Sequence, residues 1–288
     1  MKLKTLLLTL LLSTSLIGTS YANYQDGWDA AEKGDYKTAF NEWKPLADQG
    51  EADAQFNLGW LYSNGKGVLK DDKQAVKWYH KAANQGDADA QYNLASMHRN
   101  GEGVLKDDKQ AVKWYRKAAE QGYASAQFNL GWMYDNGKGV LKDSKEAVKW
   151  YRKAADQGNA QAQYNLGWMY DNGTGVLKDY KEAVKWYRKA TDQGQADAQY
   201  NLGVMYANGE GVLKDDKQAV KWYRKSADQG NASAQYNLAS MYAYGEGSLK
   251  DLSKAKYWIN KSYENPNAKA STVKLAKDTW KKFELWKY

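Results

Sequence analysis

The chain of 288 residues contains no cysteine, and proline and histidine occur only twice each. We therefore expect no disulfide, no thiolate metal site, no cysteine nucleophile and no cysteine-linked lipid anchor. Few prolines beside 25 glycines predict helices separated by glycine turns. The hydrophobic fraction of 43% is too high for a disordered chain, and the 13 tryptophans and 23 tyrosines require a structural or a binding explanation.

Long hydrophobic runs are also missing, except at the start of the chain. Residues 1–22 predict a secretory signal, with a short basic start and a leucine-rich apolar stretch over 6–17. Ser20 and Ala22 are small residues at the two positions that signal peptidase reads. The stretch is too short for a membrane span, and no later stretch approaches one. We expect cleavage between Ala22 and Asn23 and a soluble bacterial protein, periplasmic or secreted.

The charges do not form a block of one sign. The formal net charge is +8, and it falls to +6 when Lys2 and Lys4 leave with the predicted signal. Basic side chains alternate with acidic ones along the chain, which indicates a solvated surface. We therefore expect no nucleic-acid partner.

A period of 36 residues dominates the sequence. Glutamine recurs at 55, 91, 127, 163, 199 and 235, and tryptophan at 78, 114, 150, 186, 222 and 258. This period predicts six repeats, between a hairpin cap over 23–50 and a capping helix over 267–288. Stacking of such units is required because a single unit cannot bury its own apolar stripe. The predicted repeats are 51–86, 87–122, 123–158, 159–194, 195–230 and 231–266.

Each repeat reads as two helices. Apolar residues at helical spacing predict a first helix that ends at Asn64-Gly65, where a left-handed helix cap suits the flanking periods better than a hairpin turn. Asp71 is placed to cap the second helix, with Gln74 at the spacing of a capping box. In that helix Trp78 and Tyr79 lie on the predicted buried face, so we assign most of the aromatic residues to stacking.

The repeated segments resemble a known family. The runs 54–59 (Ala-Gln-Phe-Asn-Leu-Gly), 65–68 (Gly-Lys-Gly-Val) and 75–79 (Ala-Val-Lys-Trp-Tyr) are similar to the Sel-one-like repeat (SLR). That repeat is a variant of the tetratricopeptide repeat with a longer loop between its helices. The resemblance implies an all-α, right-handed superhelical solenoid of antiparallel helix hairpins. It also implies an adaptor that holds partner proteins in a concave groove lined by the first helices.

No residue pattern predicts catalysis, a cofactor or a metal site. His80 and His98 do not recur in other repeats, and neither a His-Glu-x-x-His nor a Gly-x-Ser-x-Gly motif is present. Some bacterial relatives in the family are linked to β-lactam binding or weak hydrolysis, but those are rich in disulfides and this chain has no cysteine. We therefore do not expect an enzyme.

Positions that differ among the repeats are free to serve a partner. On the first helix one such series is Trp60, Ser96, Trp132, Trp168, Val204 and Ser240, and a second is Ser63, Arg99, Asp135, Asp171, Ala207 and Ala243. Alignment with the tetratricopeptide pattern places both series on the concave face, beside a series of aromatic residues. The predicted partner-binding residues are Trp60, Arg99, Phe128, Trp132, Asp135, Tyr164, Trp168, Asp171 and Tyr200.

Aromatic faces beside carboxylates suit a protein or peptide partner with Arg or Lys side chains. The leading hypothesis is therefore an exported, monomeric adaptor for protein–protein interaction. One alternative is a protein that binds or weakly hydrolyses cell-wall glycans or β-lactam-like molecules. Another is a secreted effector that binds host proteins through the same surface.

Overall fold

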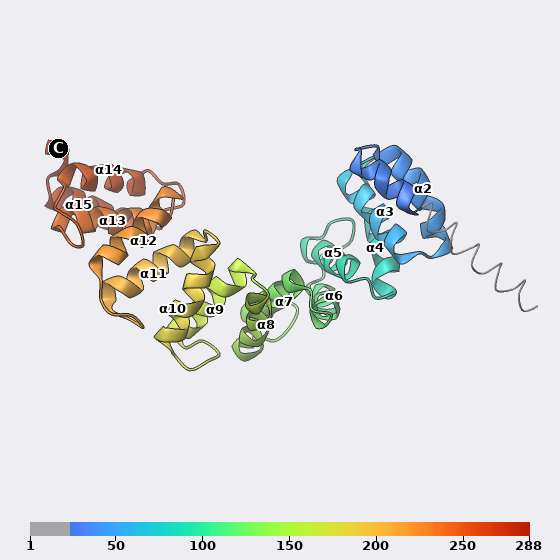
Figure 1. The fold of residues 1–288 in the computed structure, drawn as a ribbon, viewed down its shortest axis with the longest axis horizontal. Helices are drawn as coiled ribbons and strands as arrows, with labels where there is room; N and C mark the ends of the chain where they lie inside the picture. The colour runs from blue at the N-terminus through green and yellow to red at the C-terminus, as the bar shows by residue number, and fades with distance from the viewer. Residues whose placement is uncertain (1–23) are drawn as a thin grey trace, which may run out of the picture. The chain divides into compact units, whose positions relative to one another are not determined.

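The computed structural model describes residues 24–288, which form helices and no strand. The predicted signal at residues 1–22 lies outside these residues. Consecutive helices pack as antiparallel hairpins (Figure 1), which confirms the prediction of an all-α hairpin solenoid. The chain divides into two compact units, residues 1–142 and 143–288.

The first unit starts with a hairpin made by a helix over residues 24–32 and α2. Ala39 and Trp43 of α2 are buried against the first repeat. Its labelled helices are α2 (Tyr36–Gln49), α3 (Ala52–Asn64), α4 (Asp72–Asn84), α5 (Ala88–Asn100), α6 (Asp108–Glu120) and α7 (Ala124–Asn136).

The second unit continues the same alternation and ends in an extra helix with a short 3₁₀ turn, η1 (Leu285–Lys287). Its α-helices are α8 (Ser144–Asp156), α9 (Ala160–Asn172), α10 (Tyr180–Asp192), α11 (Ala196–Asn208), α12 (Asp216–Asp228), α13 (Ala232–Tyr244), α14 (Leu252–Tyr263) and α15 (Ala270–Lys282).

The predicted helix ends are present, but the capping box is only half formed. Gly65 adopts the left-handed conformation after α3, and the Asp71 carboxylate accepts a hydrogen bond from the Gln74 amide at 3.0 Å. The prediction is wrong about the reciprocal bond, because the Asp71 amide donates to the Tyr62 carbonyl at 3.0 Å. That bond ties the start of α4 to the end of α3 and closes the hairpin. Asp107, Asp179, Asp215 and Asp251 make the same backbone bond in their own hairpins.

A ladder of buried glutamines joins successive repeats. Gln163 is 4% exposed, and its amide nitrogen donates to the Ala155 carbonyl at 3.1 Å. Its carbonyl oxygen accepts from Gln193 at 2.8 Å, and Gln193 also donates to the Gly158 carbonyl at 2.9 Å. A buried polar side chain is tolerated here because its hydrogen bonds are made. The ladder explains why glutamine recurs every 36 residues.

The repeated aromatic residues of the second helices are buried, as predicted, except Trp222 of α12, which is half-buried. Tyr79 packs over Gly59 so closely that a Cβ on this glycine would lie 2.6 Å from the ring. Trp78 is 3% exposed, and the ammonium of Lys81 lies 4.0 Å from the centre of its ring. A tryptophan and a lysine three residues later repeat this contact in α6, α8, α10 and α12.

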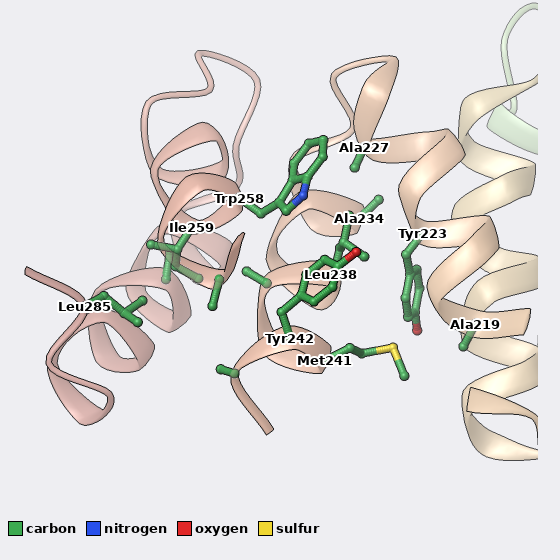
Figure 2. Close-up of a cluster of buried hydrophobic side chains, with 14 residues drawn as sticks. Ala219, Tyr223, Ala227, Ala234, Leu238, Met241, Tyr242, Trp258, Ile259 and Leu285 are labelled. Atoms are coloured by element: carbon green, nitrogen blue, oxygen red, sulfur yellow. The ribbon is translucent and has the colours of Figure 1, made fainter. Parts of the chain in front are cut away.

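The last helices close the apolar end of the second unit. Figure 2 shows Trp258 and Ile259 of α14 in one cluster with Leu238 and Tyr242 of α13 and with Leu285. In α15, Ala276 is buried in this cluster, and Trp280 and Phe283 are half-buried against it. Thr272 and Thr279 of the same helix are also buried.

Candidate partner-binding surfaces

The aromatic series of the first helices packs on the tyrosines of the second helices. The rings of Tyr164 and Tyr187 have centres 6.1 Å apart, and those of Tyr200 and Tyr223 are 6.0 Å apart. Tyr164 and Tyr200 are half-buried, so each ring keeps a solvent-facing part. Burial raises the pKa of both phenols, which therefore remain neutral hydrogen-bonding groups at neutral pH. Phe128 of α7 is half-buried in the same way.

Three of the predicted residues line one groove in the second unit. Tyr164, Trp168 and Tyr200 face a hollow of about 500 Å³ between α9, α11 and the segments that follow α12 and α14. Trp168 is 40% exposed, and no Lys or Arg of the described chain lies over its ring. The rest of the lining is polar apart from two alanines, and it consists of Ala196, Asp197, Asn201, Gln229, Gly230, Asn231, Ala232, Ser233, Asn267 and Lys269.

Hydrogen bonds within the chain fix part of this lining. Asn231 donates to the Asp197 carboxylate at 2.9 Å, and Asn201 donates to the Tyr187 hydroxyl at 3.0 Å. The Ser233 hydroxyl and the side-chain carboxamide of Asn267 make no hydrogen bond within residues 24–288, while the Asn267 backbone N–H donates to Asn265 at 2.9 Å. The groove therefore offers an aromatic wall, a held carboxylate and polar groups that are available to a ligand.

The predicted acidic residues lie outside the groove. Asp171 is half-buried and accepts a hydrogen bond from the Tyr187 hydroxyl at 3.3 Å. Burial raises the pKa of Asp171, and the Tyr187 hydrogen bond partly offsets that effect. Burial also raises the pKa of Asp135, at the end of α7, while the charge of Lys142 opposes the shift. Asp197, which the sequence analysis did not select, is the carboxylate that lines the groove.

Arg99 and Trp132 meet in the first unit. The Arg99 guanidinium lies 5.0 Å from the centre of the Trp132 ring and donates to the Asn129 carboxamide at 3.1 Å. One face of Trp132 is therefore already covered by a cation of the chain itself. Trp60 is 36% exposed and has its ring 5.8 Å from that of Tyr36, at the N-terminal end of the unit.

Most of the polar groove lining was not predicted from the sequence. Gln229, Gly230 and Asn231 lie in the turn between two repeats, Ala232 and Ser233 begin α13, and Asn267 and Lys269 lie between α14 and α15. One sequence feature could have indicated these residues. The residue after the constant glycine at the end of each repeat varies between repeats, as in Gly122-Tyr123 and Gly230-Asn231.

Neither a metal-binding cluster nor a membrane-spanning helix is found among residues 24–288. This part of the chain has no group of three or more His, Cys, Asp or Glu side chains placed to hold a metal ion. None of its helices combines the length and the apolar character needed to cross a bilayer. His80 is exposed and His98 is half-buried, with burial lowering the pKa of the His98 imidazole.

The stacked hairpins with an exposed groove define a helical-repeat scaffold, a class of protein that mediates protein–protein interactions. The Sel1 repeat profile matches residues 52–87, 88–123, 124–159, 160–195, 196–231 and 232–267. The chain therefore belongs to the Sel1 repeat family.

Solved structures agree with this assignment. The chain is 37% identical to a Sel1 repeat protein from Oxalobacter formigenes, over 86% of this chain and 98% of that one, with a TM-score of 0.73. It is 33% identical to c5321, a protective antigen present in uropathogenic Escherichia coli strains that displays an SLR fold. That match covers 96% of this chain and 71% of the other, with a TM-score of 0.71. A comparison with curated protein sequences gave no significant match.

Proposed function

We propose that the protein is an exported scaffold that holds a peptide segment of a partner protein in the groove of the second unit. The supporting observation is the open face of Trp168 in a groove that also contains the Asp197 carboxylate. A Lys or Arg side chain of the partner would stack on the indole and pair with the carboxylate. The free Ser233 and Asn267 side chains would bind peptide groups of the same segment.

The location follows from the predicted signal at residues 1–22. A bacterial periplasm or the cell exterior is the proposed compartment, with cleavage between Ala22 and Asn23. The chain has no cysteine, so its stability in this compartment would come from packing and hydrogen bonds rather than from disulfides.

A peptide library displayed on phage tests the groove. The mature protein should enrich segments containing Lys or Arg, and Trp168→Ser should abolish that enrichment. Serine already occupies the equivalent position at Ser96 and Ser240, so the fold accepts it. Trp60→Ser is the matched control, because it removes a tryptophan at the same repeat position outside the groove. Equal enrichment by all three proteins, or enrichment of acidic segments at the groove, would refute the proposal.

A glycan is the alternative ligand of this groove. Tyr164, Trp168 and Tyr200 supply flat rings, and the carboxamides around them suit sugar hydroxyls. Titration with peptidoglycan fragments, followed by intrinsic tryptophan fluorescence, distinguishes the two. Binding of a fragment that is lost in Trp168→Ser, with no peptide enriched, would assign the groove to glycans.

A further inference from the structure

A second pocket lies in the first unit and has a different chemical character from the groove. It has a volume of about 300 Å³ and is lined by Arg99, Asn100, Lys106, Asp108, Trp132 and Lys138. Arg99 and Asn100 end α5, Lys106 belongs to the loop that follows, Trp132 is on α7, and Lys138 follows α7. Three cations therefore converge on a space that holds a single carboxylate, that of Asp108.

The central cation is already oriented. Arg99 is half-buried, rests on the Trp132 ring and uses one of its amino groups to hold Asn129. The guanidinium also interacts with the Tyr115 hydroxyl. Its other N–H groups can bind a further acceptor, and stacking reduces the entropy lost when they do so. Arg99, Lys106 and Lys138 form no ion pair within residues 24–288. By contrast, the repeat equivalents of Lys106 do so elsewhere, Lys70 with Asp72 at 3.6 Å and Lys214 with Asp216 at 3.7 Å.

The repeats provide an internal comparison for this pocket. Two repeats further along, the positions of Arg99, Lys106 and Lys138 are filled by Asp171, Lys178 and Glu210. These residues are close enough for the charges of Glu210 and Lys178 to act on Asp171. One repeat junction is thus rich in cations, while its equivalent in the second unit is rich in carboxylates. Lysine recurs at the position of Lys106 in every repeat, but Arg99 and Lys138 do not recur at this second junction. Because the hairpins are built alike at both junctions, stacking does not explain these two cations.

We propose that the pocket of Arg99, Lys106 and Lys138 binds an acidic peptide, through a carboxylate held by the guanidinium and the two ammonium groups. Arginine on an aromatic face is well suited to bidentate binding of a carboxylate. The Trp132 ring would also cover the methylene groups of a Glu side chain. A dianionic phosphate fits less well, because it would place two negative charges beside Asp108. This inference does not depend on the groove, which has other residues and the opposite charge preference.

The test is fluorescence anisotropy with a rhodamine-labelled tetraglutamate peptide and the mature chain. Arg99→Asp and Lys138→Glu should each weaken binding by about tenfold or more, since each removes one charge-assisted contact and adds a repulsive charge. The chain already has Asp135 at the repeat position of Arg99 and Glu102 at that of Lys138, so we expect the fold to accept both substitutions. Lys66→Glu is the matched control, because it makes the same charge change at the same loop position in the first repeat. It should alter the affinity by no more than about twofold.

Further arms separate the outcomes. Inorganic phosphate should compete no better than sodium chloride of equal ionic strength, and strong competition would show a phosphate site instead. If Arg99→Asp folds poorly, Arg99→Ala repeats the test, because the chain already has alanine at the equivalent repeat positions Ala207 and Ala243. Trp168→Ser should bind tetraglutamate like the wild type, so failure of the groove proposal leaves this one intact. Absence of binding by the wild type, or equal binding by all variants, would overturn the inference.

Discussion

Two glycines of the second unit differ in what surrounds them, and this difference predicts unequal effects of alanine. Gly175 follows α9 with φ +71°, and an added Cβ would lie 2.3 Å from the Ser144 carbonyl oxygen at the start of α8. Gly158 ends the repeat before it with φ +89°, and an added Cβ there would meet nothing within 4 Å. Both positions therefore require left-handed backbone, but only Gly175 lies against another helix.

The expected loss of stability for each variant follows from its left-handed backbone and from any clash of the added Cβ. Alanine in the left-handed region costs roughly 1–2 kcal/mol, which we expect for Gly158→Ala. Gly175→Ala adds a clash with backbone, which cannot rotate away as a side chain does. Overpacking of this kind costs about 1–3 kcal/mol more. We expect Gly175→Ala to destabilise the protein by about 2–5 kcal/mol in total.

Urea unfolding followed by circular dichroism measures the free-energy changes. Hydrogen exchange of peptides from α8 and α9 shows where protection is lost, which matters because repeat proteins open locally. The loss for Gly175→Ala should concentrate in these two helices. Equal destabilisation by the two variants would refute the reasoning that close packing, rather than backbone conformation alone, fixes the second glycine of the loop.

Three further predictions concern the ladder, pH and export. Gln163→Ala removes a donated and an accepted hydrogen bond and should lower the free energy of unfolding by about 2–3 kcal/mol, measured by urea titration. A change under about 0.5 kcal/mol would show that the ladder does not stabilise the fold. Because burial lowers the pKa of His98 below its usual 6.5, the unfolded chain binds this proton more readily. The free energy of unfolding should therefore decrease as the pH falls below 6.5. Thermal melts of His98→Tyr over the same pH range should not show this decrease. If the variant shows the same pH dependence as the wild type, His98 is not the cause of the decrease. Mass spectrometry of the exported protein should find Asn23 as the first residue, and full-length protein confined to the cytoplasm would contradict export.

Most of the fold could be predicted because each repeat obeys the same local rules six times. The left-handed cap at Gly65 and the N-cap at Asp71 depend on residues close in sequence, and both are present. The competing bond from the Asp71 amide to Tyr62 was missed because it depends on how the loop folds back.

The candidate sites were less predictable because their residues come from different repeats. The 36-residue period places Trp168 and Tyr164 on one helix, and the structure joins them to Asn267, about a hundred residues away. Variation among repeats did identify Arg99 as unusual. It did not show that Arg99 covers Trp132, since that contact depends on the side-chain rotamers of two neighbouring helices.

The glutamine ladder makes each repeat an interchangeable module. Gln193 bonds to Gln163 and Gln229 bonds to Gln199 at the same distance of 2.8 Å. Deleting one whole period, such as residues 195–230, would make the ladder one step shorter, with Asn265 still at its end. Each remaining side-chain donor of the ladder would keep an acceptor. Loss or gain of a whole repeat would therefore shorten or lengthen the protein while keeping the hydrogen bonds of the ladder. Such changes would alter which pockets are neighbours, and so offer a route to new partner specificity without new folds.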